Sequence, residues 1–428
     1  MANSLPEYKT LTLDNGLEIY VIEMENNSNV ISTDIFYKVG SRNEVMGKSG
    51  IAHMLEHMNF KSTKNLKAGE FDERVKSIGG SNNASTGFDI THYYIKSSTP
   101  NLGNSLELFA ELMQNLKLTD SEFQSERDVV AEERRWRTDN NPSGYLYFRT
   151  FNNTYIYHPY HWMPIGFMGD ILTWTLEDIK SFHKKYYQPQ NAILIVSGDV
   201  KAEDVFKQAK EQFGKIKNSG EIPKVLFVEP EQDGAKEITV YKDSEVEMLS
   251  MTFHIPNFED EDQPALSAIS EILSSGKSSR LYKVLVDEKQ MVNQVYGYNM
   301  ENKDPGVFIF FATCNPGVKA KDVKKVIIKE IEKLKSEKVT NKELNRVKIN
   351  TKADFIYSLE NSTSVANLFG SYLARGSLKP LLEYEDKINT ITPKEILKVA
   401  KKHFNFKHST TVILKKEKSK KETNKEEK

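Results

Sequence analysis

The first forty residues alternate between apolar and polar positions, which is the pattern of strands with one buried face. Asp14-Asn15-Gly16 separates the first two alternating stretches and predicts a hairpin. After Ser49 the apolar spacing changes to three and four residues, which is typical of helices. The predicted strands of this half are 8–13, 17–24, 30–41, 89–97 and 192–196, and the predicted helices are 49–59, 69–78, 102–116, 120–137 and 175–186.

The second half of the chain repeats this plan. The segment TLEDIKSFHKKYYQPQNAILIV resembles TPKEILKVAKKHFNFKHSTTVIL, which begins 217 residues further on. At an offset of 215 residues, IAHMLEHM aligns with LSAISEIL, so that Ala268 and Ile272 take the positions of His53 and His57. The pattern indicates a duplication in which only the first copy carries imidazoles at these positions.

Length and charge set the domain count and limit the partners. With 428 residues and 49.0 kDa the chain exceeds one ordinary core, so two or more domains are expected. We expect a first domain at 1–215, a linker rich in Gly, Pro and charge at 216–235, a second domain at 236–415 and a disordered charged tail at 416–428. The formal net charge of −1 argues against nucleic acid or an anionic membrane as a partner.

The compartment and the redox chemistry are also constrained. No apolar run approaches the roughly 18 residues of a membrane-spanning helix, and the first residues lack the pattern of a signal peptide. We therefore expect a cytoplasmic protein, or a periplasmic one if a signal peptide has been removed. The single cysteine, Cys314, excludes an internal disulfide and a thiolate zinc cluster. Any metal must then be bound by imidazole and carboxylate groups.

One predicted helix carries residues suited to a metal. His53 and His57 are four residues apart, so they lie on one helix face, and Glu56 borders the same point. This is the zinc-binding helix with the place of the glutamate inverted. A catalytic zinc site has three protein ligands and a water, so a third ligand must come from elsewhere. The alternative is a surface helix that carries two histidines.

The stretch ERDVVAEERRWR offers candidates for the third ligand. Glu126 and Glu133 are seven residues apart and share a helix face, whereas Glu132 points elsewhere. One of the pair could bind metal while the other orients a histidine. The same spacing also fits an ordinary charged helix face, so spacing alone does not assign the ligand.

Together these motifs resemble those of the pitrilysin/insulinase family of zinc metallopeptidases, the inverzincins, and especially its small bacterial and mitochondrial-processing-type members. The resemblance spans essentially the whole chain and is most specific in the first half. The matching segments are VGSRNE (39–44), GIAHMLEHMNFKST (50–63), GGSNNAST (79–86) with Thr91 and Tyr93, ERDVVAEERRWRTDNNP (126–142) and HPYHWMPIG (158–166).

The resemblance implies a fold and a reaction. The fold would be α+β, with two homologous LuxS/MPP-like metallohydrolase domains, each an antiparallel sheet covered by helices. The chain would be a zinc metalloendopeptidase that hydrolyses short or unfolded peptides. One zinc ion would be bound by His53, His57 and Glu133. Glu56 would be the base and proton shuttle, and Glu126 a supporting carboxylate.

The resemblance also implies how the substrate binds. The family binds peptide as an added strand beside the zinc, and Asn83 and Ala84 match that strand. Without the resemblance, GGSNNAST would be predicted to form a turn. In this family two such chains commonly form a clam-shaped chamber, so a homodimer or a heterodimer with a related subunit is expected.

One departure from the family pattern concerns an arginine and a tyrosine that help to hold the substrate. The local frame GKSSRLYKVLVDEKQMVNQVYGY places Val286 and Asn293 at those two positions, and neither can stabilise an oxyanion as a cation or a phenol does. Arg280 and Tyr296 are close in sequence, but Arg280 matches a separate family position. A partner subunit would then supply the pair. The alternative function is a non-catalytic peptide-binding or scaffold subunit of a family heterodimer.

The remaining histidines are interpreted as structural. His92, His158 and His161 lie in matched segments but have no ligand partners at usable spacing, and His254 belongs to a predicted strand. The pair Gly79-Gly80 lacks the lysine of a phosphate-binding loop. We therefore expect these histidines to be structural and the glycine pair not to bind phosphate.

Overall fold

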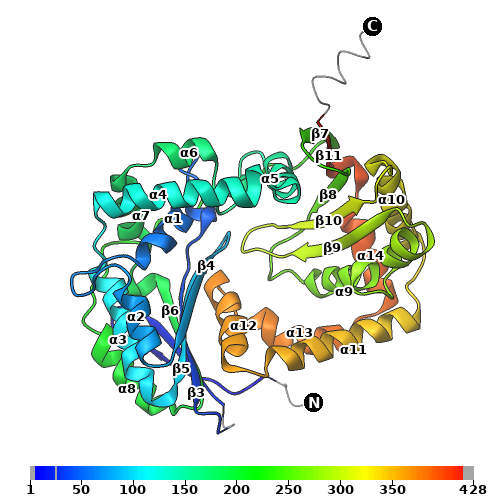
Figure 1. Ribbon diagram of the computed structural model, residues 1–428. Coiled ribbons are helices and arrows are strands. Elements are labelled where there is room, and N and C mark those ends of the chain that lie inside the picture. Colours follow the sequence, from blue (N-terminus) through cyan, green and yellow to red (C-terminus); the bar gives the residue numbers. More distant parts are fainter. Residues whose placement is uncertain (1–4, 25–26, 418–428) are drawn as a thin grey trace. The chain divides into compact units, whose positions relative to one another are not determined.

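A computed structural model describes residues 5–24 and 27–417. By contacts the chain divides into two compact units (Figure 1). Unit 1 comprises Met1–Arg134, His158–Val228 and Ala353–Leu382, and unit 2 comprises Arg135–Tyr157, Glu229–Lys352 and Glu383–Lys428, within the described residues. The units interleave along the chain, whereas the sequence predicted consecutive domains at 1–215 and 236–415. Those ranges stay a prediction, because compact units and homologous domains need not share boundaries. Most of the predicted tail, 418–428, lies outside the described residues.

Unit 1 is built on a six-stranded sheet in the order β1-β2-β6-β3-β5-β4. All neighbouring strands pair antiparallel except β2 and β6, which are parallel. The hairpin predicted at Asp14-Asn15-Gly16 joins β1 to β2, and Gly16 has a φ of +84°, a conformation that favours glycine. The strands are β1 (Lys9–Thr12), β2 (Glu18–Glu23), β3 (Val30–Tyr37), β4 (Ser81–Thr86), β5 (Thr91–Ser98) and β6 (Ala192–Gly198).

Helices cover both faces of this sheet. The large core on one face is formed with α1 (Ile51–Asn59), α2 (Glu70–Ser77), α3 (Leu102–Asn115), α4 (Asp120–Arg134), α6 (Met168–Thr173), α7 (Leu176–Tyr186) and α8 (Ala202–Phe213). The other face is covered by α12 (Ser362–Arg375), which packs against β3 and β6. Helix α12 comes from the second half of the sequence, so this unit depends on both halves of the chain.

Unit 2 has a five-stranded sheet in the order β7-β11-β8-β10-β9. Its strands are β7 (Lys236–Lys242), β8 (Met248–His254), β9 (Val292–Met300), β10 (Val307–Cys314) and β11 (Ser409–Lys416). The main core is formed with α9 (Gln263–Ser274), α10 (Ala320–Ser336) and α14 (Pro393–His403). Helix α5 (Pro142–Thr154), from the first half of the sequence, packs against β8 and β11. Helices α11 (Asn341–Ser358) and α13 (Lys379–Thr390) contain the last two boundaries between the units.

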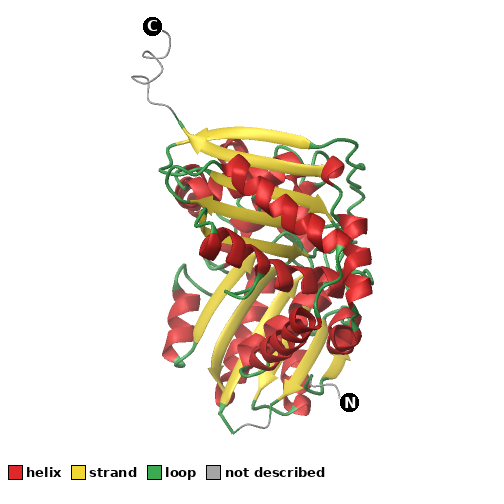
Figure 2. Cartoon of the chain, turned by 90° about the vertical axis from the view of Figure 1, so that its right-hand side faces the viewer, coloured by secondary structure: helices red, strands yellow, loops and turns green. Residues whose placement is uncertain are grey.

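The two sheets share one topology. The order β2-β6-β3-β5-β4 in unit 1 corresponds to β7-β11-β8-β10-β9 in unit 2, and in each the first pair is parallel and the others antiparallel. This agrees with the duplication inferred from the sequence. It also confirms the α+β fold class, in which helices accompany the strands (Figure 2). Each sheet contains one parallel pair, β2 with β6 and β7 with β11. Each parallel pair contains a strand that follows a helix and lies between two strands that precede it in the sequence. These are β6, between β2 and β3, and β11, between β7 and β8.

Two local predictions had different outcomes. Helix α2 ends at Ser77 and is followed by Gly79 with a φ of +69°, as the Gly79-Gly80 pair predicted. The next residues form strand β4, whereas their composition alone predicted a turn. Among the described residues, no helix combines the length and the apolar character needed to cross a membrane.

Candidate metal centre

The N-terminus of α1 is fixed by a buried glutamate. Glu44 accepts hydrogen bonds from the backbone N–H groups of Gly50 and Ala52, both at 2.8 Å, and from the indole N–H of Trp162 at 2.7 Å. The side-chain oxygens of a glutamate satisfy the unpaired donors of a helix start in this way. Burial raises the pKa of Glu44 to about 8, although the three hydrogen bonds oppose this. Gly50 has a φ of +87°, and a Cβ there would lie 2.7 Å from the Ile165 carbonyl oxygen.

Helix α1 has an apolar face and a second face that carries His53 and His57. Its buried side chains, among them Met54, Leu55 and Met58, belong to the core of unit 1. His53 and His57 are less deeply buried, with 12% and 22% of their side chains exposed. The four-residue spacing therefore presents both imidazoles toward one point, while the neighbouring apolar residues hold the helix in place.

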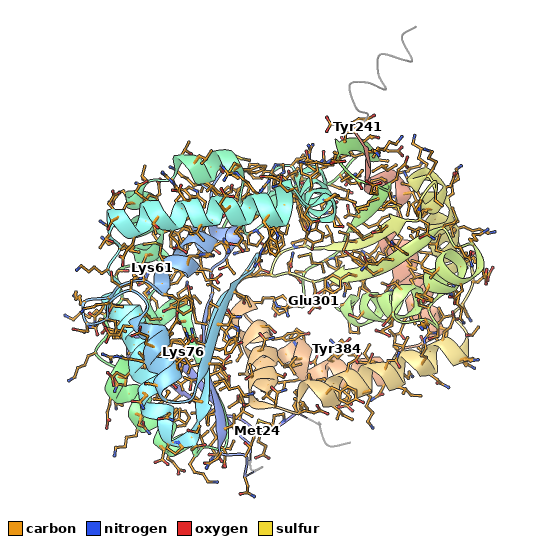
Figure 3. The ribbon with its side chains drawn as sticks, in the orientation of Figure 1. Met24, Lys61, Lys76, Tyr241, Glu301 and Tyr384 are labelled. Carbon is orange, nitrogen blue, oxygen red and sulfur yellow. The ribbon has the colours of Figure 1, made fainter. Side chains whose placement is uncertain are left out.

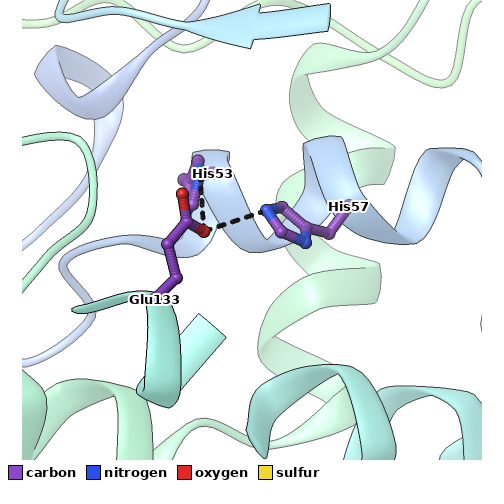
Figure 4. A group of neighbouring side chains, drawn as sticks. All are labelled: His53, His57 and Glu133. Carbon is purple, nitrogen blue, oxygen red and sulfur yellow. Dashed lines mark ion pairs between the residues drawn. The ribbon is translucent and has the colours of Figure 1, made fainter. Parts of the chain in front are cut away.

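Helix α4 packs against α1 and brings a carboxylate to that point. Glu133 Oε2 lies 3.6 Å from His53 Nε2 and 3.4 Å from His57 Nε2 (Figure 4). One ligand atom from each residue can be chosen so that all three lie within 4.8 Å of one another. A tetrahedral zinc with bonds of about 2.0–2.1 Å separates its ligand atoms by about 3.3 Å. The donor set and its spacing therefore fit a zinc ion.

Glu126 contacts the far side of one imidazole. Its Oε1 lies 2.8 Å from His57 Nδ1, so that His57 Nε2 faces Glu133. The other oxygen, Oε2, pairs with Lys61 Nζ at 2.5 Å (Lys61 is labelled in Figure 3). Carboxylates in this position fix the orientation of a metal-binding histidine. The exposed Glu132 lies outside the group of potential ligands.

Without a bound metal, the His57 imidazole is positively charged at neutral pH, with a proton on each ring nitrogen. Burial disfavours the charged imidazole, but hydrogen bonds and charges from Glu126 and Glu133 outweigh it and raise the pKa of His57 to about 9. The pKa of Glu126 is lowered, because the hydrogen bonds of His57 and Lys61 outweigh its burial. A metal that binds here must displace the His57 proton.

Strand β4 is an edge strand, and its last residue contacts Glu56. Thr86, its final residue, donates from Oγ1 to Glu56 Oε2 at 2.5 Å. Asn83 is exposed, and Ala84 packs partly on the core. The Ala84 N–H donates to Asn83 Oδ1 at 2.9 Å, a side-chain acceptor on its own strand.

Comparison with known proteins identifies the family to which the chain belongs. Residues 20–158 match the family described as Insulinase (Peptidase family M16), and residues 173–351 match the Peptidase M16 inactive domain. The chain is 53% identical over 414 residues to the zinc protease PqqE of Helicobacter pylori, and the match covers 96% of this chain and 93% of that protein. The chain belongs to peptidase family M16.

Solved structures of this family agree. A protease from Helicobacter pylori superposes with a TM-score of 0.94 at 53% identity, over 96% of this chain and all of that one (100%). A peptidase M16 inactive domain from Pseudomonas fluorescens gives a TM-score of 0.87 at 16% identity, over 96% and 98% of the two chains, and supports the fold alone. The predicted family membership is therefore confirmed.

Two further segments that carried the resemblance in the sequence contact the helices that hold the candidate ligands. VGSRNE supplies Glu44, and HPYHWMPIG supplies Trp162, which donates to it. Gly166, from the same segment, has its carbonyl oxygen bonded by Arg134 of α4. A Cβ on Gly166 would lie 2.5 Å from the Ser49 carbonyl oxygen. These segments thus connect the start of α1 to the end of α4.

The two positions to which the resemblance assigned an arginine and a tyrosine lie in unit 2. Val286 packs partly against the core of unit 2, and Asn293 is exposed on β9. Arg280 forms two hydrogen bonds to Glu343, at 2.7 and 3.1 Å, and Tyr296 stacks on a phenylalanine of β10. Arg280 is thus already engaged in a structural ion pair.

The other candidate groups have structural contacts. His92 Nε2 lies 2.7 Å from the buried Asp34, His158 Nδ1 accepts from a backbone N–H at 3.1 Å, and His254 Nε2 lies 3.3 Å from a carbonyl oxygen. His161 lies against the rings of two aromatic neighbours. Burial raises the pKa of the Cys314 thiol to about 12, which keeps it protonated. No other group of three potential ligands occurs among the described residues.

Proposed function

We propose that this M16 chain is a zinc metalloendopeptidase of short or unfolded peptides. The observation that carries the proposal is the convergence of His53, His57 and Glu133 beside Glu56. The zinc-protease names of relatives support the metal, and the ligand spacing supports a tetrahedral ion. When bound, zinc would polarise the scissile carbonyl and lower the pKa of a water molecule.

The other steps of the reaction are assigned to residues of the chain itself. His57 is held by Glu126, so that its Nε2 faces the metal position. Glu56 takes the proton of the attacking water at its carboxylate and passes it to the leaving amine. Strand β4 pairs with an extended peptide through its free edge, where a peptide carbonyl would replace Asn83 Oδ1 on the Ala84 N–H. Pairing through the backbone favours short or unfolded substrates.

The decisive experiment compares three carboxylate variants. Glu56→Gln should keep zinc and lose about 10²–10⁴-fold in peptide hydrolysis, the usual contribution of a general base. Glu133→Gln should lose both zinc and activity. Glu132→Gln, one residue away and exposed, is the matched control and should keep both. Zinc is measured by elemental analysis and hydrolysis with a quenched fluorescent peptide. Undiminished hydrolysis by Glu56→Gln contradicts the mechanism.

We further propose that a related subunit supplies the missing arginine and tyrosine. Val286 and Asn293 provide neither cation nor phenol, and Arg280 is held by Glu343. The chain alone should then bind zinc but hydrolyse peptide slowly until its partner is added. Assays of the chain alone and with its paralogue test this. Full activity of the lone chain contradicts the partner requirement and leaves the zinc chemistry standing.

A further inference from the structure

Thr86 has no assigned role, yet its hydroxyl contacts the base directly. Its Oγ1 donates to Glu56 Oε2 at 2.5 Å. We propose that Thr86 is a positioning residue that orients the Glu56 carboxylate and so connects the peptide-binding strand to proton transfer. The proposal rests on the proposed function, because it concerns the same base and the same strand.

The alternation of β4 places Thr86 correctly for this role. Asn82, Ala84 and Thr86 are partly buried, whereas Ser81, Asn83 and Ser85 are exposed. Successive side chains of a strand point to opposite faces, so Thr86 points to the same face as Ala84, which packs on the core that includes α1. The strand therefore offers its edge to a peptide and its last hydroxyl to Glu56.

The backbone around Thr86 is fixed independently of this hydroxyl. Thr86 pairs with Thr91 in the ladder between β4 and β5. Beyond it, the Gly87 N–H donates to Ile90 O at 2.8 Å, and the Arg42 N–H donates to Phe88 O at 2.8 Å. Removal of the hydroxyl should therefore leave the fold of β4 intact.

Glu56 has a similarly fixed backbone but a rotatable side chain. It lies in α1, whose apolar face is buried and whose N-terminus is held by Glu44. A hydrogen bond to Oε2 restricts rotation of the carboxylate that accepts the proton. A general base works only in the correct geometry, so loss of this restraint should slow turnover without weakening peptide binding.

The test compares valine and serine at position 86. Thr86→Val keeps the shape and removes the donor, and kcat should fall by about tenfold with KM and zinc content unchanged. Thr86→Ser keeps the hydroxyl and should restore kcat to within about threefold of wild type, because only a methyl group is lost. Thr99→Val is the matched control, since it removes a comparable bond, from Thr99 Oγ1 to Asp199 O at 2.8 Å, elsewhere in unit 1. This control should retain wild-type kcat.

The outcomes separate this proposal from the proposed function. If Glu56→Gln is inactive and Thr86→Val keeps wild-type kcat, the positioning role is wrong and the base assignment stands. Equal loss in the valine and serine variants, or a change confined to KM or zinc content, also overturns the positioning role. If Glu56→Gln is fully active, the base assignment fails and the Thr86 proposal fails with it.

Discussion

Helices α1 and α9 occupy corresponding places in two sheets of the same strand order. Helix α1 packs against the edge strand β4 and against α7, and α9 packs against the edge strand β9 and against α14. In the aligned positions α1 carries His53 and His57, and α9 carries Ala268 and Ile272. The two residues of α9 are fully buried, whereas the two imidazoles are partly exposed.

The sheet of unit 2 forms with apolar residues at both of these positions. In α9 the side chains at these positions are part of the apolar core of unit 2. In α1 the side chains at these positions are imidazoles that face Glu133. The support around α1 is correspondingly polar, with Glu44 at its start and Glu126 behind His57. The candidate metal centre of unit 1 thus carries polar side chains at positions where unit 2 has apolar contacts.

The largest effect is expected from giving α9 a ligand of α1. Ile272→His buries an imidazole without a built partner and removes apolar contacts, so the free energy of unfolding should fall by about 4 kcal/mol. Ile272→Val, the control, should cost only about 0.5–1.5 kcal/mol. Denaturant unfolding of both variants measures the difference. If the histidine is tolerated as well as the valine, the packing of α9 does not exclude imidazole and the contrast with α1 is wrong.

Local spacing along the chain predicts the helices of the site and the pairing of its two histidines. The apolar spacing located α1, α4 and α7, and the four-residue spacing of His53 and His57 required that both face one point. Glu126 and Glu133 were candidates by spacing, but their distinct contacts arise only from the packing of α4 on α1. Only the family resemblance separated the two carboxylates beforehand.

Other features depended on contacts distant in sequence. Strand β4 is rich in Ser and Asn and low in strand propensity, and it forms because β5 offers a complete ladder. Glu44 and Trp162 are 118 residues apart, so no local pattern connects them. Helix α5 belongs to unit 2 and helix α12 to unit 1, so each lies in the unit formed mainly by the other half of the sequence. A prediction of consecutive domains cannot include such an exchange. Tertiary packing decides each of these features.

A second prediction uses pH to distinguish the two helices. In the metal-free protein the pKa of His57 is raised from 6.5 to about 9, so its stabilising contribution is complete below pH 6.5 and is lost as the pH rises through 9. The change amounts to about 3 kcal/mol. The difference in unfolding free energy between the wild-type chain and His57→Gln, measured in chelator, should shrink by this amount. A pH-independent difference would falsify the charged imidazole, and Ile272→Val should show no such trend.

The smallest effect is expected for zinc affinity when Glu126, the carboxylate that contacts His57 of α1, is replaced. Glu126→Gln keeps the shape but turns an amide N–H₂ toward Lys61 or His57, both of which donate to the native carboxylate. Zinc affinity should fall by about 10–100-fold, as for other partners of metal-binding histidines. Competition with a zinc chelator measures the loss. Lys61→Met in the Glu126→Gln background removes one of the two conflicting donors, so the double variant should bind zinc more tightly than Glu126→Gln alone. Unchanged zinc affinity of Glu126→Gln would mean that packing alone, as in α9, orients the helix face.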